Sequence, residues 1–398
     1  MSDEFGNELP ETTRYEEPLS KLRVAHEDFV LYHAGLPGFP RHFFRDVVIS
    51  AFLFSDMKML RDKLKFAAKL QGKKIDPVTG EQPGIIFHEY DLGLLNGVEL
   101  AGREGKTTFY NGCDTTALFL LGHELYLTQS QDYSLLTAQK ESIKLAVEYI
   151  LRHLDDNYLF VEDPKFAGAT AFALKVTYWK DSELKSRPNG EPVYPVIYPL
   201  AHIQNMAALR AAGRILNSKK LLKTAIKMKK AIKLLINGKK DSLYVAIDKM
   251  GPIEGVSSDS LHALFYLEPK DIGGVTLRKM LEAAVVLETA FGYRTLSPTE
   301  SHEVADSYHS TTIWTHEQAI IHKGATKHWR WASANNFPKL ALLLSRIREV
   351  SSRVDMYLRA NPDSNPELFV IEGNKIVAGG CDPQLWAIAA RSYFSRVL

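Results

Sequence analysis

The segment 179–182, Trp-Lys-Asp-Ser, combines residue types suited to acid–base chemistry on a sugar ring. The indole of Trp179 offers a flat apolar surface for one face of a pyranose, and it lowers the polarity around Asp181. A carboxyl in such surroundings has its charged form disfavoured, which suits a general acid working near neutral pH. The alternative interpretation is a structural tryptophan beside solvated charges.

Arg45 and Asp46 are adjacent at the expected start of a helix, after a loop rich in Gly and Pro at 35–40. Asp46 alone could be a first-turn charge that satisfies free N–H groups. Side by side, guanidinium donors and a carboxylate acceptor can also hydrogen-bond vicinal hydroxyls, each of which both donates and accepts. Both interpretations remain open from the sequence.

Three further segments place carboxylates beside bases, aromatics or loop-forming residues: His88-Glu89-Tyr90, the block 308–317 that ends in Trp314-Thr-His316-Glu317, and Glu367 after Asn-Pro-Asp-Ser-Asn-Pro. Glu317 could be only a first-turn acid stabilised by the helix dipole. Glu367, taken alone, could be only a surface charge in a loop.

Metal and nucleotide chemistry find little support. His316 and His322 are 322 − 316 = 6 positions apart, so they do not share a helix face as the ligands of a His-Glu-x-x-His site do. We therefore expect no metal site and no cofactor. Neither a glycine-rich phosphate loop nor a Gly-x-Ser-x-Gly motif is present.

Composition indicates an ordinary globular protein, with 45% apolar residues, 24% charged residues and a net charge of +2. The nine lysines between 219 and 240 are interspersed with apolar residues, as on the solvent-exposed face of an amphipathic helix. We therefore do not expect nucleic acid as a partner. The acidic start, the lack of a long apolar run and the two cysteines predict a cytoplasmic protein without membrane attachment. No feature predicts the oligomeric state.

Helical periodicity dominates the chain. We expect a leader at 1–18 and then one domain at 19–398, because no linker divides it. Apolar stripes predict helices at 142–154 and 340–350, and a long helical pattern at 43–70. Further helices are expected near 19–32, 113–129, 196–216, 218–237, 258–267, 274–289, 313–328 and 382–397.

Strand-like alternation is scarce. Short breaks alternate with long ones at 72–110, 155–195, 238–257, 291–311 and 359–381, which indicates helix hairpins in a closed ring with the long loops at one end.

Several motifs in order resemble the amylo-α-1,6-glucosidase domain of glycogen-debranching enzymes. They are Gly35-Leu-Pro-Gly-Phe, Arg45-Asp46, Pro83-Gly-Ile-Ile-Phe-His-Glu-Tyr, Tyr110-Asn-Gly-Cys-Asp, Trp179-Lys-Asp-Ser, Gly292-Tyr-Arg-Thr-Leu-Ser-Pro, Tyr308-His with Trp314-Thr-His-Glu, Pro366-Glu-Leu-Phe and Cys381-Asp-Pro-Gln-Leu-Trp. The match covers about residues 30–398. That family and its relatives, which include glucoamylases and family 63 glycosidases, have an all-α (α/α)6 barrel.

The resemblance implies an inverting glycoside hydrolase of the α-glucosidase type. We expect it to be exo-acting and to release a terminal hexose, namely glucose, from a small α-glycoside, because a short chain with a closed pocket favours a small carbohydrate substrate. The resemblance makes Asp181 the general acid and Glu367 the general base, two carboxyls about 6.5–9.5 Å apart in inverting enzymes. The pocket lining that it implies consists of Arg45, Asp46, His88, Glu89, Tyr90, Asp114, Trp179, Lys180, Trp314, His316 and Glu317.

The chain departs from the family pattern where Trp314-Thr-His-Glu stands in place of Trp-Pro-His-Asp, which leaves Glu317 as a competing candidate for the base. Two other functions stay open on the same barrel. One is an isomerase or epimerase of free sugars that uses loop histidines, such as His88, His202, His309 and His316. The other is a carbohydrate-binding protein without catalysis.

Overall fold

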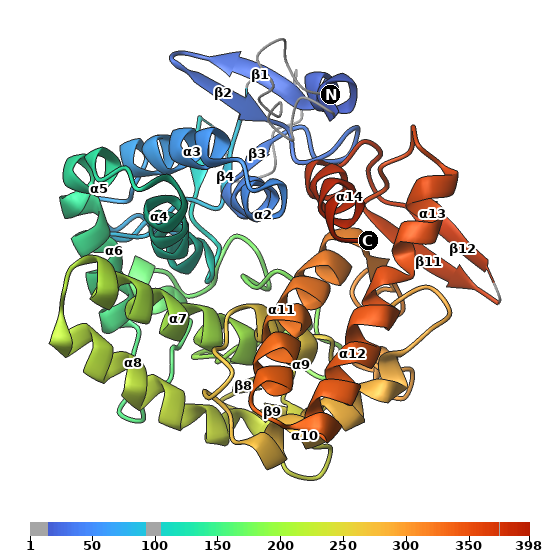
Figure 1. Cartoon of the computed structure of the whole chain (residues 1–398). Coiled ribbons are helices and arrows are strands. Elements are labelled where there is room, and N and C mark those ends of the chain that lie inside the picture. Colours follow the sequence, from blue (N-terminus) through green and yellow to red (C-terminus); the bar gives the residue numbers. More distant parts are fainter. Residues whose placement is uncertain (1–14, 93–104, 374) are drawn as a thin grey trace.

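The computed structural model describes residues 15–92, 105–373 and 375–398 of the chain, and helices dominate it (Figure 1). Six of these helices pack side by side in a ring that closes when the last meets the first. In order around the ring they are α2 (Phe44–Phe54), α4 (Thr115–Ser130), α7 (Pro199–Ile215), α9 (Asp259–His262), α11 (Thr315–Ala334) and α14 (Leu385–Val397). The chain thus forms a helical barrel.

A second set of helices packs on the outside of this ring. It comprises α3 (Met57–Lys69), α6 (Lys140–Arg152), α8 (Lys219–Ala231), α10 (Gly274–Ala283) and α12 (Pro338–Ser352), while α1 (Glu16–Leu22) and α13 (Val354–Ala360) contact α14. The outer helices are amphipathic: in α6, Ile143, Val147 and Ile150 face inward and the intervening charges face water. Every residue of α2, in contrast, is buried, as an inner helix requires.

Shorter pieces complete the described chain. They are α5 (Ser134–Ala138) and the 3-10 turns Pro164–Ala167, Pro188–Gly190, Ile232–Leu235, Ala263–Phe265 (η5), Ala284–Leu287 and Ser301–Glu303. Small antiparallel sheets join β3 (His42–Phe43), β4 (Glu89–Tyr90) and β5 (Thr108–Phe109), and β10 (Ile313–Trp314), β11 (Leu368–Glu372) and β12 (Lys375–Gly379). Two-stranded sheets pair β1 (Arg23–His26) with β2 (Phe29–Tyr32), β6 (Ile236–Asn237) with β7 (Ser242–Leu243), and β8 (Ala246–Asp248) with β9 (Gly251–Ile253).

The expected helix at 19–32 is wrong beyond residue 22. Residues 23–32 form the β1–β2 hairpin, in which Glu27 adopts a left-handed conformation with φ 49° at the turn. The β-branched and aromatic residues Val24, Phe29 and Val30 favour strands, and tertiary packing lets this preference prevail over the weak helical spacing. The hairpin of β11 and β12 likewise occupies part of the expected loop 359–381.

The helical pattern at 43–70 forms two helices. Ser55 takes a left-handed conformation with φ 59° after α2, and the Asp56 side chain caps α3 by accepting from the Met59 N–H. The helices predicted at 142–154 and 340–350 are confirmed as α6 and α12. Residues 1–14 of the expected leader, and 93–104 of the expected loop 72–110, lie outside the described residues, and α1 crosses the expected boundary at residue 18.

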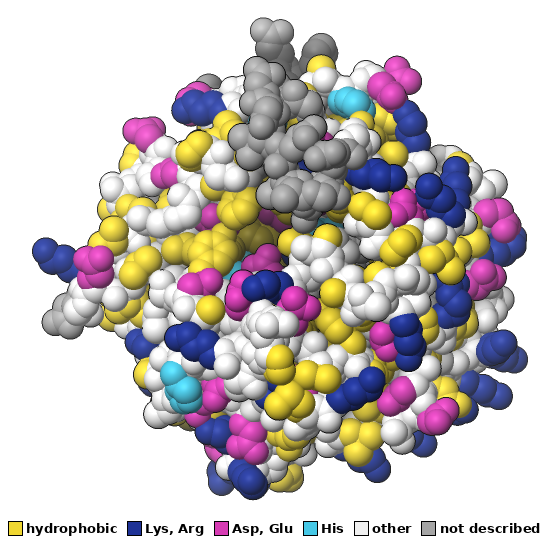
Figure 2. Space-filling model, turned by 180° about the vertical axis from the view of Figure 1, so that it is seen from behind, with side chains coloured by type: hydrophobic (Ala, Val, Ile, Leu, Met, Phe, Trp, Pro, Cys, Tyr) yellow, Lys and Arg dark blue, Asp and Glu magenta, His cyan; other side chains and the backbone are white. Residues whose placement is uncertain are grey.

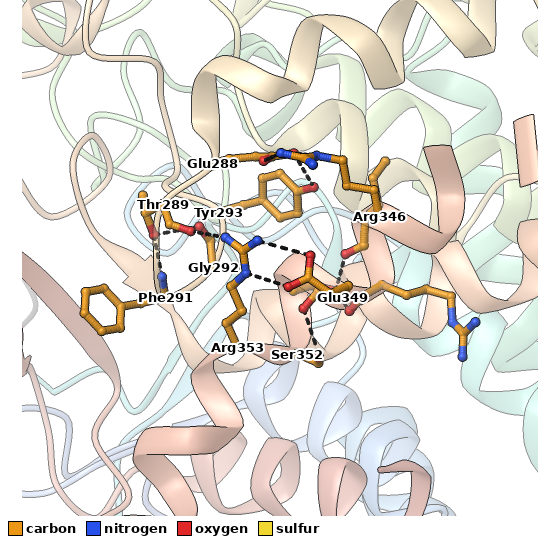
Figure 3. Close-up of polar contacts among 12 residues, drawn as sticks. Glu288, Thr289, Phe291, Gly292, Tyr293, Arg346, Glu349, Ser352 and Arg353 are labelled. Carbon is orange, nitrogen blue, oxygen red and sulfur yellow. Dashed lines mark hydrogen bonds and ion pairs between the residues drawn. The ribbon is translucent and has the colours of Figure 1, made fainter. Parts of the chain in front are cut away.

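The segment 288–293, at the start of the long connection to α11, is fastened to α12 (Figure 3). Arg353 donates to the Thr289 carbonyl at 2.5 Å and to Glu349 at 2.8 and 3.1 Å. Arg346 forms a two-pronged ion pair with Glu288 at 2.8 and 2.5 Å. These contacts hold one end of the loop that later carries Tyr308 and His309.

The contact between α11 and η5 depends on Gly324. A Cβ at this position would stand 2.5 Å from the backbone nitrogen of Phe265, so Gly324→Ala must push two backbones apart. We expect it to lower the free energy of unfolding by about 1 kcal/mol or more, despite the better helix propensity of alanine. Urea unfolding measures this change.

The matched control is Gly274→Ala, at the first residue of α10, where an added Cβ meets nothing within 4 Å. This change should leave stability the same or raise it slightly. Equal stabilities of the two variants would contradict the close approach of α11 and η5.

Candidate active site

The pocket that gathers most of the sequence-predicted residues lies where three inner helices begin. Arg45 and Asp46 open α2, Trp314 precedes α11, and Trp386 lies in the first turn of α14. The pocket spans about 460 Å³, a volume that includes the open solvent at its mouth. Its lining residues are Ala34, Phe39, Phe43, Arg45, Asp46, His88, Trp179, Asp181, Tyr308, His309, Trp314, Glu367, Gln384 and Trp386.

Aromatic side chains form much of the pocket wall. The Trp314 ring meets Trp179 and Trp386 edge to face, with centroids 5.8 and 5.7 Å away, and all three indoles are buried. Figure 2, which views the molecule from behind relative to Figure 1, shows a hollow around which hydrophobic and acidic side chains gather. The same mixture of aromatic rings and carboxylates lines the pocket.

Arg45 is fixed by Asp114 at the back of the pocket. Nε and Nη2 of Arg45 donate to the two carboxylate oxygens of Asp114 at 2.8 and 2.9 Å. Nη1 makes a longer contact of 3.4 Å to Nε2 of His88, which must accept because a guanidinium can only donate. Asp114 does not line the pocket; it orients Arg45.

Asp46 is almost fully buried and accepts a hydrogen bond from Nε2 of Gln384 at 3.2 Å. Burial raises the pKa of Asp46 to about 7, although the positive charge of Arg45 opposes this shift. The nearby charge of Glu367 raises the pKa further. Asp46 can therefore exchange a proton near neutral pH.

Asp181 reaches the pocket from its long loop. Its side chain is 47% exposed, but the recess around it still excludes much of the surrounding water, and this desolvation raises its pKa to about 6. Nδ1 of His309 lies 3.7 Å from Asp181, yet burial and the charges of Lys180 and Arg45 hold the pKa of His309 well below its usual range. The neutral His309 gives Asp181 no cationic partner.

His309 has a defined tautomer. The Ser182 hydroxyl donates to Asp306 at 2.7 Å, so it must accept from Nδ1–H of His309 at 2.9 Å. The His309 ring also stacks on Trp314 at 4.9 Å. This chain of contacts holds the wall beside Asp181.

Glu367 is held from both sides. Oε1 accepts from the Tyr308 hydroxyl at 2.5 Å and Oε2 accepts from the Cys381 N–H at 3.0 Å. Burial raises the pKa of Glu367, and the charge of Asp181 adds to the shift. Gly380, with φ 71°, lies against this carboxylate, where a Cβ would overlap Oε2.

The other sequence-predicted residues do not line the pocket. Lys180 contacts Asp259 at 2.9 Å and the hydroxyls of Ser257 and Ser258 at 2.8 and 2.7 Å. Glu317 is fully buried and accepts from Ser258 at 2.7 Å. Lys180 and Glu317 therefore belong to a buried network outside the pocket lining.

The remaining predicted residues support the pocket or lie beside it. His316 stacks on the Trp386 ring at 3.8 Å. Glu89 lies 3.5 Å from Arg41, and the Tyr90 hydroxyl meets Nε2 of His26 at 3.1 Å. None of these three side chains is part of the pocket lining.

Sequence reasoning did not single out several lining residues. The motifs of the family resemblance contained a signal for four of them, namely Phe39, Tyr308, Gln384 and Trp386, and His309 was considered for the isomerase alternative. Phe43 carried no signal, because an aromatic residue beside a helix start is usually part of a core. Within the described part of the chain, no cluster of three metal-ligating side chains occurs and no helix is long and apolar enough to cross a membrane.

The fold resembles that of known glycosidases. The mannosylglycerate hydrolase of glycoside hydrolase family 63 from Thermus thermophilus, solved with Tris and D-glycerate, is 10% identical, with a TM-score of 0.67 over 97% of this chain and all of that one. The same enzyme with glucose gives a TM-score of 0.67 over 98% of this chain. A structure described as a wild-type glycosidase is 11% identical, with a TM-score of 0.60 over 97% of this chain and 95% of that one.

No protein-family model and no curated protein sequence matches the chain. At such low identity the structural likeness shows the fold, which is the helical-barrel fold of these glycosidases. It agrees with the fold expected from the sequence motifs. The narrower assignment to the amylo-α-1,6-glucosidase type, made from the sequence motifs, stays a prediction.

The buried carboxyl of Asp46 yields a prediction about stability. Its pKa is about 7 in the folded protein, against 3.8 for an ordinary aspartate, so its stability cost grows as pH rises from about 4 and is complete above about 7. Asp46→Asn keeps an acceptor for Gln384 and removes this cost. We expect the variant to gain about 1–3 kcal/mol more over wild type at pH 8 than at pH 5.

Chemical denaturation at both pH values measures this gain. Asp28→Asn, at an exposed aspartate, is the control and should show no such difference between the two pH values. A gain for Asp46→Asn that is equal at pH 5 and pH 8 would mean that the Asp46 carboxyl titrates normally.

Proposed function

We propose that the chain is an inverting, exo-acting glycoside hydrolase that releases a terminal hexose from a small α-glycoside. In this proposal residues 19–398 form one (α/α)6-barrel catalytic domain of the amylo-α-1,6-glucosidase type. The observation that carries the proposal is the shared pocket of Asp181 and Glu367, two carboxyls with different surroundings. A glycosidase needs such a difference, because one carboxyl must hold a proton while the other must accept one.

Asp181 suits the role of general acid. Its pKa of about 6 keeps a substantial protonated fraction near neutral pH, and its half-exposed position lets it reach the glycosidic oxygen of a bound substrate. In the proposed step, the proton of Asp181 moves to this oxygen as the bond between the anomeric carbon and the oxygen breaks.

Glu367 suits the role of general base. One donor occupies each of its oxygens, the Tyr308 hydroxyl and the Cys381 N–H, and each carboxylate oxygen has a second acceptor site left for a water molecule. In the proposed step, Glu367 takes a proton from this water as the water oxygen bonds to the anomeric carbon from the opposite face. The configuration is then inverted.

The other lining residues suit a sugar ring. Arg45 and Asp46 present donors and an acceptor for neighbouring hydroxyls, and the indoles of Trp179, Trp314 and Trp386 offer faces for C–H groups. The pocket is small, which favours a small glycoside. A disaccharide, or a glucosyl or mannosyl derivative of a small acid, fits this class, and one structural relative is a mannosylglycerate hydrolase.

The isomerase alternative finds less support. It depends on loop histidines as acid and base, but His202 is buried between the Phe160 N–H and the Met228 carbonyl, and His316 stacks behind Trp386. The lining histidines His88 and His309 each use one ring nitrogen for a structural contact.

Asp181→Asn and Glu367→Gln should respond differently to the leaving group. With an unactivated disaccharide, each variant should lose about 10²–10⁴-fold in kcat, since each loses one acid–base step. With a glycosyl fluoride, whose leaving group needs little protonation, Asp181→Asn should recover most of its activity and Glu367→Gln should not. Initial rates on both substrates measure this.

Glu372→Gln, an exposed change on strand β11, which directly follows Glu367, is the control and should keep wild-type rates. A folded Glu317→Gln without activity, together with an active Glu367→Gln, would transfer the base role to Glu317. An NMR time course should show the inverted anomer first, and a retained anomer would contradict the inverting mechanism.

The substrate is tested with trehalose, maltose, isomaltose, glucosylglycerate and mannosylglycerate, by release of free monosaccharide. Turnover of at least one of them supports the proposal. Isomerisation of a free sugar without a second product would support the isomerase alternative, and binding of sugars without turnover would support the non-catalytic one.

A further inference from the structure

A second pocket lies at the far end of the barrel from the candidate active site. It is formed by α11, α12, α14 and η5 and encloses about 1020 Å³, open to solvent. Helix α11 begins beside the active site at Thr315, and its residues 323–330 reach this pocket about 12–22 Å further along the helix axis. We call this the distal pocket, and nothing in the proposed catalytic mechanism uses it.

The distal pocket is lined by cations. Lys323, Lys327, Arg330 and Arg348 all face it, and its described lining includes no Asp or Glu. Within the described chain, none of these four side chains has a carboxylate within ion-pair distance, whereas Arg346, the other arginine of α12, is paired with Glu288. Such a concentration of unpaired charge is unusual, because like charges repel when they are gathered in a recess.

Helix capping explains part of this arrangement. Lys323 donates to the Phe52 carbonyl at 2.8 Å and Lys327 donates to the Phe265 carbonyl at 2.6 Å, at the ends of α2 and η5. An ammonium group has three N–H bonds, so each lysine keeps two for another partner.

The two arginines are not explained by capping. Arg348 donates from Nε to the Thr326 hydroxyl at 3.0 Å and lies over the Trp329 ring at 4.5 Å, which fixes the guanidinium and leaves its two terminal nitrogens available. Arg330 is exposed and has no hydrogen bond to the described residues. Both therefore offer donor groups to the pocket.

The electrostatics of the site also favour an anion in the distal pocket. Burial lowers the pKa of Lys323 and of Lys327 to about 8, and the charges of Arg396 and Arg210 add to this. The acids nearest to Lys327, Glu268 and Asp271, are paired with Arg210. A bound anion would relieve this repulsion.

We propose that the distal pocket binds a compact polyanion, namely a phosphate or pyrophosphate group, either free or attached to a small organic molecule. A phosphate presents several acceptor oxygens around one centre, which matches donors that converge from two lysines and two arginines. Phe265 and Tyr393 on the pocket wall can contact an organic part.

The cations converge in a recess, and this distinguishes the distal pocket from the lysine-rich face of α8. There Lys220, Lys223 and Lys227 line a groove together with Asp155 and Asp156, so the groove contains its own counter-charges. The proposal does not depend on the glycosidase function, because none of these residues lies at the candidate active site.

Isothermal titration at constant ionic strength tests the proposal with two probes, inorganic pyrophosphate and glucose 6-phosphate. We expect saturable binding of at least one probe, with one site per chain. Stronger binding of pyrophosphate would identify the free anion as the ligand class, and stronger binding of glucose 6-phosphate would identify a phosphoester. If neither probe binds saturably, the proposal is wrong.

The variant Arg330→Gln/Arg348→Gln should weaken binding about tenfold or more, because it removes two charge-assisted donors. Circular dichroism checks that the double variant is folded. If it is not, the single variant Arg330→Gln, at an exposed side chain, replaces it and should also weaken binding. The control Lys220→Gln/Lys223→Gln removes the same charge from α8 and should bind as wild type does. Equal weakening in both double variants, or displacement of the probe by glucose, would overturn the distal site.

Discussion

The contact of α14 with α2 closes the ring, and the candidate active site depends on this closure. Leu385 N–H donates to the Ala34 carbonyl at 2.8 Å, and Gln384 Nε2 donates to Asp46, 338 positions away in the chain, at 3.2 Å. Glu367 precedes the β11–β12 hairpin that leads to α14, so the same closure brings its carboxylate to the pocket that Arg45 and Asp46 enter from α2. The pocket does not exist in any one segment of the chain.

Charge burial is the second physical theme of the pocket. Asp46, Asp181 and Glu367 all have raised pKa values, mainly because protein atoms replace water around them; Arg45 partly compensates at Asp46 and Asp181, and the Tyr308 hydroxyl and Cys381 N–H do so at Glu367. Arg45 is itself engaged by Asp114 through two hydrogen bonds, which limits how far its charge serves the other carboxylates. The large apolar core of the inner helices offsets the cost of desolvating these groups.

The two ends of the barrel have opposite electrostatic character. The end where α2, α11 and α14 begin gathers carboxylates around an aromatic pocket. The end where they finish gathers lysines and arginines, some of which cap helix carbonyls. Helix α14 lines both pockets, through Trp386 at one end and through Tyr393 and Val397 at the other.

The sequence by itself determined the helical periodicity, the alternation of short and long connections, and the chemical character of the motifs around Asp181 and Glu367. These features are local, since apolar spacing and loop composition act within a few residues. Local patterns could not divide the motif residues into those that line the pocket and those that support it. Only the tertiary structure decided that Glu317 and Lys180 lie in a buried network, and that Tyr308 and Gln384 reach the pocket. The reason is that orientation depends on how each helix is rotated within the closed ring, a property of contacts between segments 59 to 338 residues apart.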